Sequence, residues 1–366
     1  MRSLCAQTIA LICAVAGFAA TSSQGCAQEP FYKGKRLTVL VNYAPGGSTD
    51  AEGRVFARHI GRHIEGNPAV IVQNMDGAGG LVGAKYVGEV APRDGTVAGY
   101  FTATAFLYAL EPERFRVDFK DYEFVAIQPG TSINFVRADV SPGMKQAADI
   151  VKAQNLIIGA LAPDSSKGTR MRLAFDMLGV PYRFISGYRS GGAAKLALQR
   201  GEINFFGESP PGYFGSVEPG LIKTGEAIPV YYEPVFDGTK FSVPEALKGV
   251  SILPFHEFYE TVKGTKPSGR LWEIYKSVLS VDGAAYRLIA MPPGAPPTAL
   301  AALRAAIERL NSDRAYAEEA GKVLGFVPIW QTGPDVNQTA RTAMSINPEV
   351  RASLADYIRE KRDRPQ

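Results

Sequence analysis

Four short segments rich in glycine, serine and threonine each connect a strand-like apolar run to a helix-like run in this sequence of 366 residues. They span residues 41–50, 72–80, 162–170 and 187–192. The first turn of an α-helix carries unpaired backbone N–H groups and the positive end of the helix dipole. Glycine lets a ligand approach the backbone closely, and serine and threonine add hydroxyl donors. Four such loops together predict a binding site for one small anion.

The residues expected to contact this anion come from all four loops. In the first two loops they are Tyr43, Gly46, Gly47, Ser48, Thr49, Asp50, Gly77, Ala78, Gly79 and Gly80. In the last two loops they are Ser165, Ser166, Lys167, Thr169, Arg170, Tyr188, Arg189, Ser190 and Gly191. Arginine can hold a carboxylate through two parallel hydrogen bonds, so Arg170 and Arg189 are expected to clamp one, with Lys167 as a further cation. Taken singly, any one of these loops is more typical of a structural turn.

Other chemistry finds little support in the sequence. Gly77, Gly79 and Gly83 mimic the glycine spacing of a dinucleotide-binding loop, but they do not lie in the first strand–helix unit. His59 and His63 stand four residues apart on one helix, as two metal ligands would, yet no third ligand is near in sequence. With so few histidines, a nucleophile, a base and an orienting group are hard to assemble. We therefore expect no catalytic residues, no metal and no cofactor.

The N-terminal segment predicts export. Residues 4–20 are mostly apolar and follow Arg2, and small residues flank Cys26. This pattern is typical of a secretory signal peptide, here residues 1–27, with cleavage after Ala27. Lipidation at Cys26 is the alternative. Because all three cysteines lie in this segment, the mature chain would suit the oxidising periplasm without disulfides.

The composition is that of an ordinary globular protein with a sizeable core. The chain is 46% hydrophobic and 21% charged. Its formal net charge is +4 and it has no run of five basic residues, so we expect no nucleic-acid partner. No second apolar stretch is long enough to span a bilayer, so the mature protein is expected to be soluble.

Strand-like and helix-like patterns alternate along the chain, which is typical of α/β architecture. Strands are expected at residues 36–42, 69–73, 96–102, 155–160, 182–186, 202–207, 286–291 and 326–329. Helices are expected at residues 50–64, 167–178, 193–200, 297–310, 316–324 and 348–361. Thr49 and Glu52 are expected to form a capping box on the first helix. For residues 208–270, a long loop lining a cleft and a packed irregular connection both stay open.

The order of these motifs resembles the Bug family, the TctC-like periplasmic substrate-binding components of tripartite tricarboxylate transporters. The similar segments are 43–50 (YAPGGSTD), 72–80 (VQNMDGAGG), 91–96 (APRDGT), 187–192 (GYRSGG), 199–203 (QRGEI) and 290–297 (AMPPGAPP). Their order and spacing hold over roughly residues 30 to 360. The combination is specific, although each segment alone is not.

The resemblance implies a two-lobed flytrap of type II, in which each lobe is a mixed sheet flanked by helices. It implies a first lobe at residues 28–130 plus 284–366, a second lobe at residues 131–283, and a ligand between them. It also implies a monomeric periplasmic protein that captures a small carboxylate and delivers it to membrane transporter subunits. The alternatives are an exported enzyme acting on a small anion and a sensor that hands its ligand-bound form to a signalling partner.

Two departures from the family pattern bear on the ligand. Met75 and Asp76 stand where the family has an Arg-Pro pair, which puts a negative charge near the predicted anion site. Lys167 and Arg170 stand in a third loop that lacks the usual Gly-Ser-Ser-Gly core. Asp76 is unfavourable beside an anion unless it points away or is neutralised.

Overall fold

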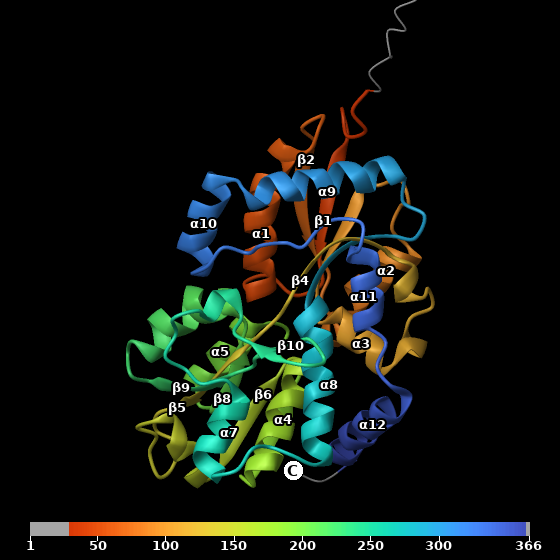
Figure 1. The fold of residues 1–366 in the computed structure, drawn as a ribbon. Coiled ribbons are helices and arrows are strands. Elements are labelled where there is room, and N and C mark those ends of the chain that lie inside the picture. Colours follow the sequence, from red (N-terminus) through yellow and green to blue (C-terminus); the bar gives the residue numbers. More distant parts are fainter. Residues whose placement is uncertain (1–28, 364–366) are drawn as a thin grey trace, which may run out of the picture.

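The computed structural model describes residues 29–363, so the predicted signal peptide and the lipidation site at Cys26 lie outside the described residues. Two five-stranded sheets form the centres of two lobes, which lie one above the other in Figure 1. Each sheet mixes parallel and antiparallel strands. The predicted class, a two-lobed α/β protein with a mixed sheet in each lobe, is confirmed.

The first sheet has the strand order β2-β1-β3-β12-β4. Its strands are β1 (Arg36–Val41), β2 (Ala69–Asn74), β3 (Val97–Thr102), β4 (Glu123–Gln128) and β12 (Arg287–Met291). Strands β1, β2 and β3 run parallel, and β12 lies antiparallel between β3 and β4. A strand from late in the sequence therefore completes the sheet that the N-terminal part begins.

The second sheet repeats this plan in the order β7-β6-β8-β5-β9. Its strands are β5 (Ile133–Arg137), β6 (Leu156–Ala160), β7 (Tyr182–Ser186), β8 (Phe205–Glu208) and β9 (Ala227–Tyr232). Strand β6 is parallel to β7 and β8, and β5 is antiparallel to β8 and β9. Parallel neighbours need helical crossovers, so each lobe gathers loops and helix starts at the carboxyl ends of its strands. A separate hairpin joins β10 (Val235–Phe236) to β11 (Phe241–Ser242).

Helices pack on both faces of each sheet because successive strand residues point to opposite faces. Around the first sheet lie α1 (Ser48–Ile60), α2 (Leu81–Glu89), α3 (Thr104–Leu110), α9 (Pro297–Asn311), α10 (Arg314–Leu324) and α11 (Val336–Ala343). Around the second lie α4 (Ser166–Leu178), α5 (Gly191–Gln199), α6 (Pro210–Gly212), the π-helix Tyr213–Ile222 that continues it, and α7 (Phe255–Lys263). Short 3₁₀ turns occur at Gly61–His63, Ala78–Gly80, Pro112–Arg114, Phe119–Asp121, Ala147–Lys152 and Glu245–Leu247.

Two further helices remain. Helix α8 (Arg270–Ala285) packs against α4 of the second lobe, and α12 (Pro348–Asp363) packs against α8 and against α3 of the first lobe (Figure 1). The hydroxyl of Tyr357 in α12 donates to Asp176 of α4 over 2.6 Å, and Lys361 pairs with the same carboxylate at 2.7 Å. The last helix therefore contacts α4 of the second lobe as well as α3 of the first, the lobe to which the resemblance assigns its residues. The chain passes from the first sheet to the second after β4 and returns to the first after α8.

The crossing after β4 is fixed by a close backbone contact. Gly130 N donates to the carbonyl of Asp282 over 2.9 Å, which ties this crossing to the end of α8. A Cβ atom on Gly130 would lie 2.0 Å from Cγ of Tyr286, so only glycine fits at this position. The lobe limits implied at residues 131 and 283 fall beside these crossings and stay a prediction.

The predicted elements match the structure where a continuous apolar run marks them, and most of the predicted strands and helices recur within a few residues. The strand predicted at residues 326–329 is wrong, because only an isolated bridge pairs Gln331 with Ile127. Residues 208–270 hold α6, the π-helix, β9, the hairpin and α7, so neither a long loop nor an irregular connection describes them. Strands β4, β5 and β9 and helices α2, α3, α7, α8 and α11 have no counterpart among the predictions.

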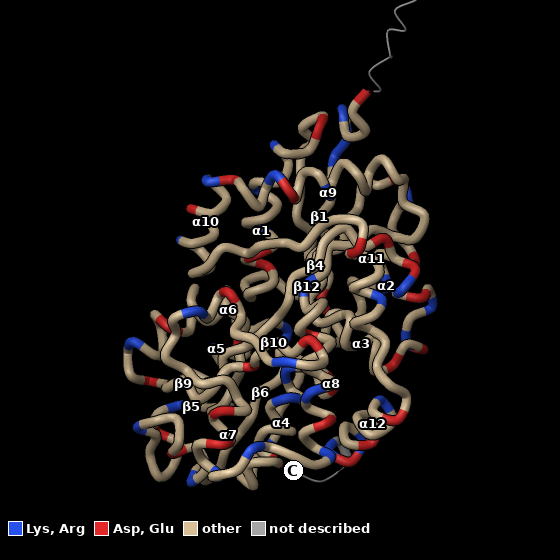
Figure 2. Tube along the Cα trace, in the orientation of Figure 1, with Lys and Arg blue, Asp and Glu red and all other residues tan. Residues whose placement is uncertain are grey.

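Charges of both signs are mixed along the chain in both lobes (Figure 2). No stretch of one sign dominates, in keeping with the small net charge of +4. Within residues 29–363, no helix combines the length and the apolar character that crossing a bilayer requires.

A buried ionic cluster joins α4 to α8 inside the second lobe. The Arg170 guanidinium pairs with the Asp282 carboxylate, and its Nε lies 3.7 Å from Oε2 of Glu233. Glu233 also accepts hydrogen bonds from Tyr275 and, over 3.1 Å, from Asn134. The side chains of Arg170, Asp282 and Glu233 are at most 2% exposed. Charges buried so deeply must be paired, because an isolated one would be strongly unfavourable.

We predict that Asp282→Ala lowers the free energy of unfolding by about 3 kcal/mol, because it leaves the buried Arg170 without its nearest counter-ion. Urea unfolding followed by circular dichroism measures this change. The control is Asp121→Ala, which alters an exposed aspartate and should shift the value by less than about 0.5 kcal/mol. Equal effects of the two substitutions would show that the cluster does not stabilise the fold.

Candidate functional site

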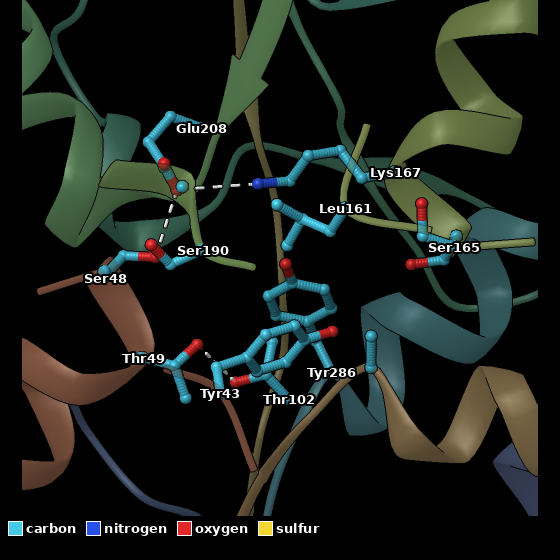
Figure 3. Close-up of a pocket in the computed structure, with 14 residues that line it drawn as sticks. Tyr43, Ser48, Thr49, Thr102, Leu161, Ser165, Lys167, Ser190, Glu208 and Tyr286 are labelled. Carbon is cyan, nitrogen blue, oxygen red and sulfur yellow. Dashed lines mark hydrogen bonds and ion pairs between the residues drawn. The ribbon is translucent and has the colours of Figure 1, made fainter. Parts of the chain in front are cut away.

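A small cavity lies between the lobes, where the loops that follow β1, β3, β6, β7 and β8 meet (Figure 3). Its volume is about 30 Å³, enough for roughly one or two water molecules. The first lobe lines it with Tyr43, Gly47, Ser48, Thr49, Thr102, Ala103 and Tyr286. The second lobe lines it with Leu161, Ser165, Ser166, Lys167, Ser190, Gly191 and Glu208. The site is complete only when both lobes are together.

The structure brings part of the predicted contact set to this cavity. The predicted residues that line it are Tyr43, Gly47, Ser48, Thr49, Ser165, Ser166, Lys167, Ser190 and Gly191. The predicted residues that do not line it are Gly46, Asp50, Gly77, Ala78, Gly79, Gly80, Thr169, Arg170, Tyr188 and Arg189. The second loop stands behind the cavity wall, because the Tyr43 hydroxyl donates to the carbonyl of Gly79 over 2.7 Å. Its predicted direct contact with a ligand is therefore not supported in this conformation.

Asp50 shapes the first loop from within. Its carboxylate accepts hydrogen bonds from Gly46 N at 3.0 Å, Arg54 Nε at 2.9 Å and Asn74 Nδ2 at 2.9 Å. Burial alone would raise the pKa of Asp50, but these hydrogen bonds outweigh it and lower the pKa below its ordinary value. Asp50 therefore stays ionised, and its hydrogen bonds hold the first loop in its conformation.

Three long helices begin at the cavity wall. Gly47 precedes α1, Ser165 precedes α4 and Ser190 precedes α5, and all three residues line the cavity. The Ser165 hydroxyl accepts from Gly168 N over 3.3 Å, and the Ser190 hydroxyl accepts from Ala193 N over 3.2 Å. Each serine satisfies one N–H group of its helix, so other first-turn donors remain free to meet an anion.

The start of α1 differs from the predicted capping box. Gly47 precedes the helix, and no side chain caps it. Thr49 Oγ1 lies 3.1 Å from Oγ1 of Thr102, and the Glu52 carboxylate pairs with Arg287 at 2.7 Å. The capping-box prediction is wrong because the cavity floor and a buried ion pair engage both side chains.

Ser166 carries the observation that points most directly to a ligand. The residue is 1% exposed and lines the cavity, and its hydroxyl has no hydrogen-bond partner within the described part of the chain. Buried hydroxyl groups are nearly always hydrogen-bonded in native proteins. A ligand or an ordered water in the cavity would provide the missing partner.

The cavity wall contains one ion pair, Lys167 with Glu208 (Figure 3). The Lys167 ammonium lies 3.5 Å from Oε1 of Glu208, and both side chains are at most 10% exposed. Ser48 reaches the same oxygen from the first lobe at 3.1 Å. A carboxylate at this position has no counterpart among the predicted site residues.

A second cation lies directly behind the cavity floor. Arg287 donates to the Thr102 hydroxyl over 2.5 Å, and Thr102 lines the cavity. Burial acts to lower the pKa of Arg287, but Glu52 and the further neighbours Tyr100, Tyr286 and Glu208 together outweigh it and raise the pKa. Arg287 therefore remains cationic and orients the Thr102 and Thr49 hydroxyls of the floor.

Several of the missed lining residues share a signal in the sequence. Thr102 ends the strand predicted at residues 96–102, Leu161 follows the strand predicted at 155–160, and Glu208 follows the run at 202–207. Ligands of open parallel sheets gather at the carboxyl ends of strands. That rule, applied to every predicted strand and not only to glycine-rich loops, would have found these three residues. Tyr286 begins a strand and has no such signal.

The two histidines with metal-ligand spacing, His59 and His63, each lie against a carboxylate of another segment. His59 lies 2.5 Å from Glu319, and His63 lies 2.6 Å from Asp313, so both tie α1 and the turn after it to α10. No group of three metal-binding side chains occurs among residues 29–363. The pair of histidines serves packing between helices of the first lobe.

Sequence relatives match only part of the chain, and no protein-family model matches it. A UPF0065 protein of Agrobacterium vitis is 27% identical over 179 residues, or 47% of this chain and 50% of the relative. Protein BugT of Bordetella pertussis is 40% identical over 75 residues, or 20% of this chain and 21% of BugT. The chain thus spans about half the length, or less, of these relatives.

Solved structures match over most of the chain. The periplasmic binding protein BugD superposes with a TM-score of 0.63 at 14% identity, covering 90% of this chain and 99% of BugD. MatC from Rhodopseudomonas palustris, solved with bound malate, superposes with a TM-score of 0.60 at 20% identity, covering 87% and 98%. The chain is therefore similar to Bug proteins in sequence over part of its length and in fold over most of it. The predicted resemblance to the Bug family is confirmed.

In this structure, the two predicted arginine clamps have carboxylates of the chain itself as partners. Arg170 is buried against Asp282, away from the cavity. Arg189 makes a bidentate pair with Asp76 of the first lobe, at 2.7 and 2.9 Å. Asp76 is thereby neutralised, which removes the unfavourable charge that the sequence placed near the anion site. The cation left at the cavity is Lys167.

Two ion pairs connect the lobes. Arg189 pairs with Asp76, and Arg114 of the first lobe pairs with Asp164 of the second at 2.5 Å. The Arg189 side chain is 74% exposed. Water and salt screen such a surface pair, so it contributes little to the closed state.

We predict that Asp76→Asn lowers the melting temperature at pH 7 by less than about 3 °C. Hydrogen bonds from Arg189 lower the pKa of Asp76 below its ordinary value of 3.8. The ion pair therefore stabilises the fold at pH values above the ordinary pKa of aspartate. Its contribution is lost as the pH falls through the lower pKa that Asp76 has in the folded state. Scanning fluorimetry from pH 7 down to about pH 3 should show that the difference in melting temperature between Asp76→Asn and the native protein decreases.

The control for this pH series is Asp121→Asn, which removes the charge of an exposed aspartate. It should show no comparable pH-dependent difference. A deficit of Asp76→Asn that grows on acidification would contradict the assigned direction of the pKa shift.

Proposed function

We propose that this chain is a periplasmic solute-binding protein that captures a small carboxylate between its lobes. The observation that carries the proposal is the buried, unpartnered hydroxyl of Ser166 in a cavity where three helices begin. The free N–H groups and positive dipole ends of those helices favour an anion. Lys167 adds a full positive charge at the same wall.

The geometry also supports closure around the ligand. Helix α1 belongs to the first lobe, and α4 and α5 belong to the second. A carboxylate held by donors from both lobes binds only when the lobes meet, which couples capture to closure. The release of such a ligand then requires the lobes to separate.

Relatives support the same class of function and suggest its cellular context. BugD is described as a periplasmic binding protein, and MatC was solved with malate. With the predicted signal peptide, this favours a monomer in the periplasm that delivers its carboxylate to subunits of a tripartite tricarboxylate-type transporter. Delivery to such a transporter is part of the proposal.

A binding role is favoured over catalysis by the chemistry of the cavity wall. Its titratable groups are Lys167, Glu208, Tyr43 and Tyr286, and none of the three histidines of the chain lines it. Burial raises the pKa of Tyr43 far above its ordinary value, so this phenol stays protonated and acts only as a hydrogen-bond partner. No serine–histidine or cysteine–histidine pair stands among the residues that line the wall.

The test is binding of carboxylates to the mature chain, measured by thermal shift and calorimetry. At 100 times its dissociation constant, a ligand specific for the folded state stabilises it by about 2.7 kcal/mol. The panel contains monocarboxylates, dicarboxylates and tricarboxylates. If none of them binds while one is chemically converted, an exported enzyme replaces the proposal.

We predict that Lys167→Met weakens binding of the best carboxylate by at least about tenfold, because it removes a charge-assisted donor and leaves Glu208 unneutralised. Calorimetry measures the dissociation constants. The control is Lys322→Met, which removes an exposed lysine of α10 and should leave the affinity unchanged. Equal affinities of the two variants would remove Lys167 from the site.

A further inference from the structure

Glu208 is a feature that carboxylate capture alone does not explain. It is the one acidic side chain among the residues that line the cavity, and it is 3% exposed. A buried carboxylate repels an anionic ligand and is costly to desolvate. Glu208 therefore either binds a group of the ligand or has a purely structural role.

The two carboxylate oxygens of Glu208 are used very differently. Oε1 accepts from Ser48 Oγ at 3.1 Å, from Ser209 N at 2.8 Å and from Ser209 Oγ at 3.2 Å, and it lies 3.5 Å from Lys167 Nζ. For Oε2, the described part of the chain shows no hydrogen bond. One oxygen fixes the side chain in place, and the other is left for a further donor.

Two glycines make room for this carboxylate. A Cβ atom on Gly191 would lie 1.9 Å from Oε2 of Glu208, and a Cβ atom on Gly212 would lie 2.5 Å from its Cδ. Gly191 begins α5 and Gly212 ends α6, so two separate elements leave space for the group. The position of Glu208 at the wall is therefore built into the packing of the second lobe.

The charges around the cavity fit one carboxylate. Lys167 balances Glu208, and behind the floor Glu52 balances Arg287. The positive charge that remains comes from the dipoles of α1, α4 and α5, whose N-terminal ends together carry about one and a half positive charges. A second carboxylate inside the cavity would meet Glu208 and be repelled.

We propose that the ligand presents one carboxylate to the helix starts and, close to it, a hydroxyl or ammonium group that donates to Glu208. Glu208 is then a specificity-determining residue, and the preferred ligands are hydroxy acids or amino acids. This inference rests on the proposed binding function. It goes further by naming the chemistry of the group beside the carboxylate.

The first experiment needs no variant. The ligands form two sets. In the three-carbon set, lactate, alanine and propionate differ only in the group beside the carboxylate. In the four-carbon set, malate, aspartate and succinate differ in the same way. In at least one size class, the hydroxy or amino acid should bind at least about tenfold tighter than the unsubstituted acid, because the latter leaves Glu208 unpaired. Calorimetry on the native mature chain measures all six.

The second experiment uses Glu208→Gln, which keeps an acceptor oxygen but loses the charge. Binding of a hydroxy acid should change less than about fivefold, binding of an amino acid should weaken more than about tenfold, and binding of the unsubstituted acid should not weaken. The control is Glu202→Gln, whose side chain is 51% exposed. Melting of the unliganded variant checks its folding, and if it is unfolded the native panel decides alone.

The outcomes separate the inference from the proposed function. Propionate and succinate binding as tightly as their substituted counterparts would overturn the inference and leave the binding protein intact. A uniform loss of affinity for every ligand in folded Glu208→Gln would also overturn it, since Glu208 would then serve closure through Ser48. Failure of every carboxylate to bind the native chain would instead reject the proposed function.

Discussion

The rest of the site depends on the unpaired backbone N–H groups at the starts of α1, α4 and α5. These groups cannot be satisfied inside their own helices, and here they face a cavity between two lobes. Both sheets must therefore aim the carboxyl ends of their parallel strands at the same space. The shared strand order, with the antiparallel strand in fourth position, achieves this in each lobe. The fold thus brings the N-terminal ends of helices from both lobes to one cavity.

Side chains behind the cavity hold this arrangement through buried charge pairs. Arg287 connects the floor threonines to Glu52 of α1, and Arg170 connects α4 to Asp282 of α8. Each pair fixes a helix whose first turn lines the cavity. Buried ion pairs are a weak source of net stability, but a broken pair is strongly unfavourable. The loss of either partner would therefore leave an unpaired buried charge next to a helix that lines the cavity.

The sequence predicted the parts of the fold that carry a local signal. Apolar runs mark β1, β3 and β6, and glycine–serine loops before amphipathic runs mark α1, α4 and α5. The sequence could not predict partners that depend on tertiary packing. Arg170 lies in a predicted loop, but its partner Asp282 is more than a hundred residues away in the sequence. From the sequence alone, Arg170 could therefore be a solvated side chain, a ligand clamp or one half of a buried ion pair. Glu208 was missed because the rule that ligands gather at the carboxyl ends of strands was applied only to the glycine-rich loops.

The departure at Asp76 shows how a residue that conflicts with a local rule can be satisfied across the cleft. In the first lobe alone, Asp76 is a negative charge near an anion site, but closure brings Arg189 against it. The closed state therefore neutralises the charge that the open state leaves exposed. This pair is largely exposed and weak, so it does not drive closure by itself. The stronger bridge is the ligand carboxylate, which under the proposed function is held by helix starts of both lobes at once, and its differential affinity for the closed state sets the equilibrium.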